Sequence, residues 1–478
     1  MDDKLRKQLA ELERRLNQGH ISRRDFLRSA SLLGLALGAG EVLAACGMRP
    51  ETPLLIDPME TIYKFPHRTT TPDGSGNTRT PSAPGTGAVD ETTVGAAAKS
   101  KQVIWYCGCC GQRFRTLEDL KKHTAAEHAW RLPATQRVDQ PTYSEYLVGD
   151  VQRFDEKNTV FSRAAWDKPY QLQVQEATAK APQGDWETFE GNALVAGAIY
   201  VDATAGSLHP NYYGYFGHLN DTGGLYGWED PVNPVQLPKP DPQWMTERVK
   251  QAARFYGADL IGICEVDERW VYSNYFELAT GKYGKLEIPY KYAIVMGIEM
   301  DSKGINESPE PEASAATALA YSQMSELSAS LAKYIRALGY PAIPCGNDSA
   351  QSIPLAIDAG LGELGRNGLM LTPEFGPRQR ICKVFTDLPL QTDQPIDFGI
   401  QSYCETCHAC AAACPKDAIR WEERTTETTS ISNRKGILRW PVDVASCYLF
   451  WRENGTDCSN CIAACPWALR SQRDWLEL

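Results

Sequence analysis

Two cysteine runs near the C-terminus have the spacing that holds iron–sulfur clusters. The first is Cys404-x2-Cys407-x2-Cys410-x3-Cys414-Pro415, and the second is Cys447 followed by Cys458-x2-Cys461-x3-Cys465-Pro466. In such a run three cysteines hold one [4Fe–4S] cluster and the fourth crosses to the other. The crossed pattern predicts two ligand sets, which are Cys404, Cys407, Cys410 and Cys465 for the first cluster and Cys447, Cys458, Cys461 and Cys414 for the second.

The predicted unit resembles a bacterial ferredoxin and would pass electrons one at a time. Cys447 is the least regular ligand, because ten residues separate it from Cys458. Zinc binding or disulfide bonding is the alternative use of these cysteines, but two runs that end in Cys-Pro favour iron–sulfur clusters.

A second metal pattern lies near the middle of the N-terminal half. It reads Cys107-x2-Cys110-x3-Phe114-x5-Leu120-x2-His123-x4-His128. Two thiolates and two imidazoles make a closed tetrahedral Zn²⁺ site, and zinc binding worth roughly 10–16 kcal/mol would fold so small a unit. A chance spacing is the alternative. The pattern predicts a ββα zinc finger over residues 101–130.

Nucleic-acid binding is not expected of this finger or of the whole chain. Residues 101–130 carry five basic and three acidic side chains, a net charge of only +2, and the whole chain carries −11. Phosphate contacts need a basic face. The finger is therefore expected to have a structural or docking role. The remaining cysteines, which form no obvious pair, are at positions 46, 109, 264, 345 and 382.

The N-terminal 45 residues are typical of a twin-arginine (Tat) export signal. Arg23-Arg24 is followed by Phe26-Leu27 and by a short apolar run from about residue 30 to 40. That run is too short to span about 30 Å of hydrocarbon. An ordinary amphipathic helix with an incidental arginine pair is the alternative. The segment ends in Leu43-Ala44-Ala45-Cys46, which leaves open lipidation of Cys46 or plain cleavage near Ala45.

Composition and periodicity predict the organisation of the rest of the chain. The chain has 478 residues, of which 42% are hydrophobic, enough for two or three domains with their own cores. The run 293–298 predicts a buried strand, and the Ala-rich segment 313–338, ending at Gly339, predicts a helix. We expect an α+β protein with the following parts: a signal peptide over 1–45, a Pro/Gly/Thr-rich linker over 46–100, the zinc unit over 101–130, a catalytic core over 131–390 and the two-cluster domain over 391–478.

Several segments of the core carry a family resemblance. They are Arg153-Phe154-Asp155 with Phe161-Ser162-Arg163, Gly257-Ala258-Asp259-Leu260 with Glu268-Arg269-Trp270, the Gly-rich stretch 360–368, Gly376-Pro377-Arg378-Gln379-Arg380, and Thr386-Asp387-Leu388-Pro389-Leu390. Together with the export signal and the two clusters, these segments resemble the corrinoid-dependent reductive dehalogenases of organohalide respiration. The resemblance covers roughly residues 140–478, and the zinc finger is not part of it.

The resemblance implies a nitroreductase-like core that binds a base-off corrinoid whose cobalt cycles through Co(I). The implied reaction is R–X + 2e⁻ + H⁺ → R–H + X⁻ on a halogenated organic substrate, as the terminal step of an anaerobic respiration. The implied partners are a small integral-membrane anchor subunit and an upstream electron donor. The implied location is the outer face of the cytoplasmic membrane.

The resemblance also assigns roles to three residues. Tyr321 matches the proton donor, Asn347 its polar partner and Arg380 the cation, and a guanidinium beside a tyrosine stabilises the phenolate left after proton transfer. The alternatives are a core tyrosine, a turn residue and a surface ion pair, with Arg378 as the nearest competing cation. Thr317 shares the helix face of Tyr321. With Asn347 and Trp451 it is expected to line the corrinoid pocket, although Trp451 could equally be a core residue.

Two other functions remain open at this point. An epoxyqueuosine-reductase-like corrinoid enzyme has a similar core and two clusters, but the export signal and Tyr321 disfavour it. A non-catalytic electron-transfer or scaffold protein would use the zinc finger and the clusters for docking, and purified protein without corrinoid absorption would favour it. A zinc-finger regulator is disfavoured by the acidic charge.

Overall fold

The fold is that of a computed structural model, which describes residues 105–106, 113–114, 119, 135–182, 186–205, 225, 231–238, 240–278 and 281–468. All of them belong to one of the two units of the chain, Pro58–Leu478. The predicted export signal, the linker and the four predicted zinc ligands lie outside the described residues. Within the described part, no helix has the length and apolar character needed to cross a bilayer.

The helices and strands follow one another along the chain in a mixed order. The helices are η2 (Ser144–Tyr146), η3 (Glu156–Asn158), α6 (Val160–Trp166), α7 (Lys168–Thr178), α8 (Trp186–Ala198), α9 (Tyr200–Ala205), α10 (Pro242–Phe255), η4 (Glu268–Trp270), α11 (Ser302–Asn306), α12 (Pro311–Ala337), α13 (Ser352–Asp358), α14 (Ile400–Thr406), α15 (Ala409–Ala413), α16 (Val444–Asn454) and α17 (Asn460–Ala463). The strands are β1 (Trp105–Tyr106), β2 (Arg113–Phe114), β3 (Gln136–Arg137), β4 (Leu260–Glu265), β5 (Asn274–Phe276), β6 (Tyr283–Lys285), β7 (Tyr292–Glu299), β8 (Ala342–Cys345), β9 (Glu363–Leu364), β10 (Met370–Leu371), β11 (Gln379–Thr386) and β12 (Ile396–Asp397).

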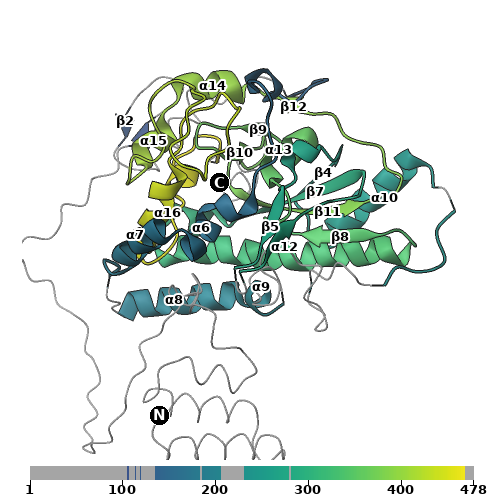
Figure 1. The fold of residues 1–478 in the computed structure, drawn as a ribbon, viewed down its shortest axis with the longest axis horizontal. Helices are drawn as coiled ribbons and strands as arrows, with labels where there is room; N and C mark the ends of the chain where they lie inside the picture. The colour runs from purple at the N-terminus through teal and green to yellow at the C-terminus, as the bar shows by residue number, and fades with distance from the viewer. Residues whose placement is uncertain are drawn as a thin grey trace, which may run out of the picture. The chain divides into compact units, whose positions relative to one another are not determined.

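A four-stranded sheet in the order β4-β7-β11-β8 forms the centre of the core (Figure 1). Each strand is antiparallel to its neighbours. The predicted strand at 293–298 is confirmed as β7, whose residues Ala293 to Ile298 are buried. Mixed helix and strand content around an antiparallel sheet agrees with the expected α+β class.

Helices cover both faces of this sheet, with α12 packed on one face and α13 on the other (Figure 1). Successive side chains of a strand point to opposite faces. Along β11, Cys382 and Val384 join the core under α12, while Ile381 and Phe385 join the core under α13. Arg380 therefore belongs to the face of α12, and Lys383 to the opposite face.

The long helix α12 confirms the helix predicted over 313–338. Leu327, Leu331 and Ile335 follow one another at helical spacing and are buried. The helix ends at Ala337 and is followed by Leu338 and Gly339, and the φ of +85° at Gly339 is a left-handed conformation that glycine adopts without a Cβ penalty. A Cβ at this position would lie only 2.4 Å from the Cα of Gln236.

Short helices α14 to α17 carry the cysteine runs. The buried carboxylate of Glu363 accepts hydrogen bonds from the backbone N–H groups of Phe398 (2.9 Å) and Ile400 (3.1 Å). These two N–H groups lie at the start of α14, so Glu363 fastens the first cysteine run to the core.

The described part of the predicted zinc unit is a β-hairpin. β1 and β2 are antiparallel, with Trp105 opposite Phe114 and Tyr106 opposite Arg113. The segment between the strands contains Cys107 and Cys110, as a ββα finger requires. The metal site itself stays a prediction.

Candidate active site and cluster sites

Tyr321, Asn347 and Arg380 come together at one edge of the sheet. Tyr321 lies on α12, Asn347 follows the end of β8, and Arg380 is the second residue of β11. The amide Nδ2 of Asn347 donates a 2.7 Å hydrogen bond to the Tyr321 hydroxyl. The Arg380 guanidinium lies 4.8 Å from the centroid of the Tyr321 ring, within cation–π range.

This arrangement suits a phenol that gives up its proton. Because Asn347 donates to the phenol oxygen, the hydroxyl proton of Tyr321 is free to point elsewhere. Tyr321 is half-buried and Asn347 is exposed, so a substrate can reach the pair.

Arg378, the competing cation of the sequence analysis, has another partner. Its guanidinium forms a buried 2.7 Å ion pair with Glu299 and also donates to the carbonyl of Met300. Arg380 is therefore the arginine that faces Tyr321.

Thr317 and Trp451, two of the three residues predicted to line the corrinoid pocket, differ in their surroundings. Thr317 is buried on α12, and its hydroxyl donates to Met300 Sδ at 3.7 Å. Trp451 lies on α16 against the rings of Phe161 and Tyr448, 6.0 and 6.1 Å away between centroids. Its indole N–H is buried without a partner among the described residues, so it could donate to a bound group.

Asp457 is a polar neighbour of Arg380 that the sequence analysis missed. Burial raises the pKa of its carboxyl, and Arg380 and the Ser314 hydroxyl oppose that rise. One carboxylate oxygen, Oδ1, is buried without a hydrogen-bond partner in the described part of the chain. The only sequence signal was its position next to Cys458.

A buried lysine supports the loop that carries Asn347. Lys383 is fully buried and donates to the carbonyl of Gly346 (2.6 Å) and to the Ser352 hydroxyl (3.1 Å). Burial lowers the pKa of Lys383 and raises that of nearby Asp348 to about 6. Burial also raises the pKa of Glu156, a third member of this group, to about 8.

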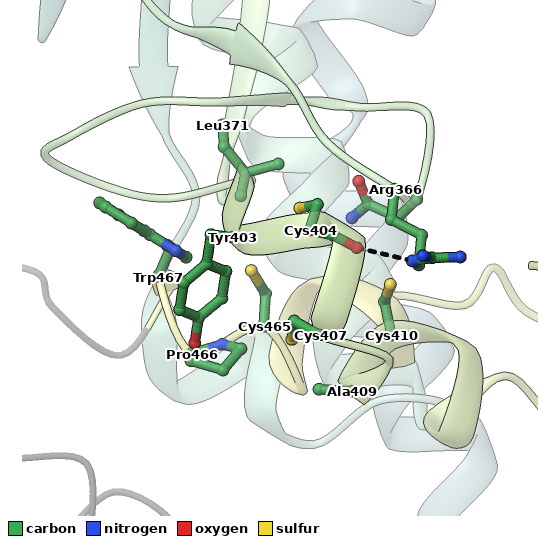
Figure 2. Close-up of a pocket in the computed structure, with 11 residues that line it drawn as sticks. Arg366, Leu371, Tyr403, Cys404, Cys407, Ala409, Cys410, Cys465, Pro466 and Trp467 are labelled. Carbon is green, nitrogen blue, oxygen red and sulfur yellow. Dashed lines mark hydrogen bonds between the residues drawn. The ribbon is translucent and has the colours of Figure 1, made fainter. Parts of the chain in front are cut away.

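The first predicted set of cysteines surrounds one cavity (Figure 2). Cys404, Cys407, Cys410 and Cys465 line it, although 54 residues of sequence lie between Cys410 and Cys465. The other lining residues are Arg366, Asn367, Leu371, Tyr403, Ala409, Pro466 and Trp467. The structure therefore brings the four side chains of this predicted set to one cavity, and their binding of a cluster stays a prediction.

The second set also gathers in space. Cys414 and Cys458 are among the charged neighbours of both Cys447 and Cys461. Burial and the neighbouring thiols raise the pKa of Cys447, Cys461 and Cys458, that of Cys458 to about 11. Metal binding must therefore displace their protons. The described residues contain no group of three or more Cys, His, Asp or Glu side chains that could hold a single metal ion.

Comparison with protein families identifies the cluster domain. Residues 403–469 match the family model of the 4Fe-4S dicluster domain, and this span includes all eight predicted ligands.

Comparison with individual proteins extends the similarity to the core. A tetrachloroethene reductive dehalogenase of Desulfitobacterium hafniense is 38% identical over 291 residues, which cover 51% of this chain and 53% of the relative. A catabolic reductive dehalogenase solved with 3-bromo-4-hydroxybenzoic acid is 25% identical, with a TM-score of 0.53 over 70% of this chain and 44% of the other. A reductive dehalogenase structure described in terms of B12-dependent dehalogenation shares the fold, with a TM-score of 0.52, 24% identity and the same coverage of the two chains. The chain spans about half the length of these proteins.

Proposed function

We propose that this chain, a homologue of the reductive dehalogenases, removes halide from an organohalide by the reaction R–X + 2e⁻ + H⁺ → R–H + X⁻. The observation that carries the proposal is the contact of Tyr321 with Asn347 and Arg380, in a core whose relatives are named for this reaction. The reaction needs a proton, two electrons and a strongly reducing centre, and residues of this chain suit each need.

Tyr321 supplies the proton. Its O–H donates toward the carbon that loses halide, while Asn347 holds the phenol oxygen in place at 2.7 Å. As the proton leaves, negative charge grows on that oxygen. The Asn347 amide and the Arg380 cation both stabilise it, which is the usual way in which an enzyme assists a weak acid.

The polar groups around this site fit a corrinoid with its rim of amide groups. Arg380 Nε, Trp451 Nε1 and Asp457 Oδ1 are buried without partners in the part of the chain that the structure describes, and buried polar atoms normally have them. Asn347, Thr317 and Trp451 would contact the cofactor in a nitroreductase-like core. When bound base-off, a corrinoid supplies a cobalt centre reducing enough to cleave a carbon–halogen bond.

Electrons reach the core through two [4Fe–4S] clusters. Each set of four thiols provides the ligands that such a cluster takes from a protein, and Cys461 and Tyr321 pack against the same hydrophobic core. Two one-electron carriers suit a two-electron reduction. The donor is an upstream component of an anaerobic respiratory complex.

The mature chain works on the outer face of the cytoplasmic membrane after Tat export, bound to a small integral-membrane anchor subunit. If Cys46 is lipidated, it adds an anchor of its own. The unit over 101–130 binds one Zn²⁺ through Cys107, Cys110, His123 and His128. None of these features belongs to the chemical step.

Halide release under anaerobic conditions tests the function. The holoenzyme, reduced by a low-potential viologen, is given a panel that includes tetrachloroethene and 3-bromo-4-hydroxybenzoic acid. We expect halide release with at least one member and a corrinoid in the acid extract of the protein. Fully loaded protein that releases halide from no chloroethene, chloroethane or haloaromatic would contradict the proposal, and protein without corrinoid would favour an electron-transfer role.

A further inference from the structure

Arg366 and Asn367 reach the first cluster site from outside the cluster domain. They lie at the tip of the hairpin formed by β9 and β10, before the start of the dicluster match at residue 403. Gly365 and Leu369 close this tip through a 2.8 Å backbone hydrogen bond. Both Arg366 and Asn367 line the cavity of Cys404, Cys407, Cys410 and Cys465, and Figure 2 shows Arg366 beside Cys404.

We propose that Arg366 and Asn367 raise the reduction potential of the cluster held by this first cysteine set, so that it is the more easily reduced of the two. The proposal rests on the cluster assignment of the proposed function. It adds a role for two core residues in setting the order in which the clusters accept electrons.

Arg366 brings a positive charge that no carboxylate neutralises at close range. The residue is 2% exposed, and its guanidinium donates to the carbonyls of Cys404 (2.9 Å), Glu422 (3.0 Å) and Glu405 (3.3 Å). Among the described residues, no ion pair involves it. Its ionisable neighbours are the thiols of Cys410, Cys404 and Cys407 and the carboxylate of Glu405, which forms its own 2.8 Å ion pair with Arg424. Although burial lowers the pKa of Arg366, a guanidinium remains charged at neutral pH.

Asn367 brings a hydrogen-bond donor to the same cavity. Its side-chain oxygen accepts from the N–H of Leu369 at 3.2 Å, which fixes the orientation of the amide. The other end, Nδ2, is buried and has no partner in the described residues. Cluster sulfurs accept N–H hydrogen bonds, and such bonds raise the potential of a cluster. The orphaned donor of Asn367 and the buried cation of Arg366 thus act in the same direction.

The second cysteine set has neighbours of opposite charge. Asp443 and Asp457 are among the charged groups around Cys447, and Arg380 offsets part of the charge of Asp457. Asp443 also caps α16, accepting from the N–H of Ser446 at 3.0 Å. Reduction adds an electron to a cluster, so nearby carboxylates oppose it while a cation favours it. The charge difference predicts a higher potential at the first cluster.

A redox titration of the holoenzyme followed by EPR measures both cluster potentials without any substrate. Arg366→Gln should lower only the higher of the two potentials, by ~59 mV. This shift corresponds to about a tenfold fall in the ratio of reduced to oxidised cluster at a fixed applied potential. Arg366→Lys should keep most of the potential because it keeps the charge. Asn367→Asp should also lower it, since it keeps the oxygen that accepts from Leu369 and replaces the donor by a negative charge.

Arg434→Gln is the matched control. Arg434 is also buried and donates to backbone carbonyls, but its charged neighbours are Asp267, Tyr272, Arg269 and Tyr143 rather than cysteines. Both potentials should therefore stay at their wild-type values in this variant.

Three results would overturn the proposal. The first is an unchanged potential in both Arg366→Gln and Asn367→Asp. The second is an equal fall in Arg366→Lys and Arg366→Gln, which would assign the effect to the carbonyl contacts. The third is a fall in the lower potential instead. If Arg366→Gln loses iron, the isosteric Asn367→Asp decides alone. An enzyme that shows these potentials but releases no halide would refute the proposed dehalogenase function. The inference that Arg366 and Asn367 raise the potential of the first cluster would still hold.

Discussion

The hydroxyl of Tyr321 is held from two sides by groups of different kinds. Asn347 donates to its oxygen along a defined direction, whereas Arg380 acts through the ring without a directed hydrogen bond. In the proposed mechanism the amide holds the phenol oxygen in place, and the cation lowers the free energy of the negative charge left after proton transfer. Replacing Asn347 and replacing Arg380 should therefore affect turnover in different ways.

Tyr321→Phe should lower turnover by roughly 10²–10⁴, the usual scale for a positioned general acid, with cofactor content unchanged. Arg380→Ala should also lower turnover, and Arg380→Lys should be milder because a point charge cannot reproduce the guanidinium plane. Tyr334→Phe, which removes another half-buried hydroxyl from α12, is the control and should keep the wild-type rate. Wild-type turnover by cofactor-loaded Tyr321→Phe would mean that another group delivers the proton.

At single positions the sequence was informative where a pattern or a family motif existed. Tyr321, Asn347 and Arg380 were found through resemblance, and the structure brings them into contact. Asp457, Arg366 and Asn367 belong to no spacing pattern of their own. Their surroundings depend on tertiary contacts between segments far apart in the chain, which no local pattern reports.

At the scale of elements, β11 serves two faces of the sheet at once. Arg380 points to α12 and Tyr321, while Lys383 lies on the opposite face beneath the loop of Asn347. Glu156 extends this buried group, because its carboxylate accepts from the N–H of Phe276 in β5 at 3.1 Å. Buried titratable groups therefore connect η3, which precedes the sheet in the sequence, with the loop that carries Asn347.

The raised pKa of Glu156, about 8, makes stability depend on pH. Between the ordinary glutamate range and pH 8 the folded chain keeps a proton that the unfolded chain releases, so stability falls as pH rises through this window. Between pH 6 and 8 the wild type should lose about 2 kcal/mol more stability than Glu156→Gln, measured by denaturant unfolding. Glu265→Gln changes an exposed carboxyl and should follow the wild type. Parallel profiles for wild type and Glu156→Gln would show that the carboxyl is ionised in the fold.

The hydrophobicity pattern of the sequence predicted the elements whose apolar side chains are buried from one end to the other. The apolar run of β7 and the repeat of α12 were read directly, because both are buried along their length. Strand β11 was not predicted, because the charged residues Arg380 and Lys383 interrupt its run of apolar residues. The helices α14 to α17 are too short to show a period, and the cysteines rather than hydrophobicity marked that region.

At the scale of the whole molecule, the metal sites differ in their dependence on the core. The first cluster site receives Arg366 and is fastened by Glu363, both from the core, whereas the predicted zinc ligands all lie within residues 101–130. Loss of zinc should therefore leave the clusters in place.

Elemental analysis of the mature protein should give about eight irons, one cobalt and one zinc per chain. Cys107→Ser should remove the zinc and leave iron and cobalt unchanged, whereas Cys407→Ser should lower iron only. Four irons in the wild type would contradict two clusters, and zinc retained by Cys107→Ser would place that metal elsewhere.

The crossed cysteine sets have a consequence for biosynthesis. The first set is completed by Cys465 and the second by Cys461, only four residues earlier, while Cys404 is translated some sixty residues before either. A nascent chain therefore carries several unpaired thiols through the ribosome tunnel and holds neither complete site until translation has passed residue 461. With these predicted ligand sets, insertion of either cluster must wait until translation has passed residue 461, and the two clusters become possible at nearly the same moment.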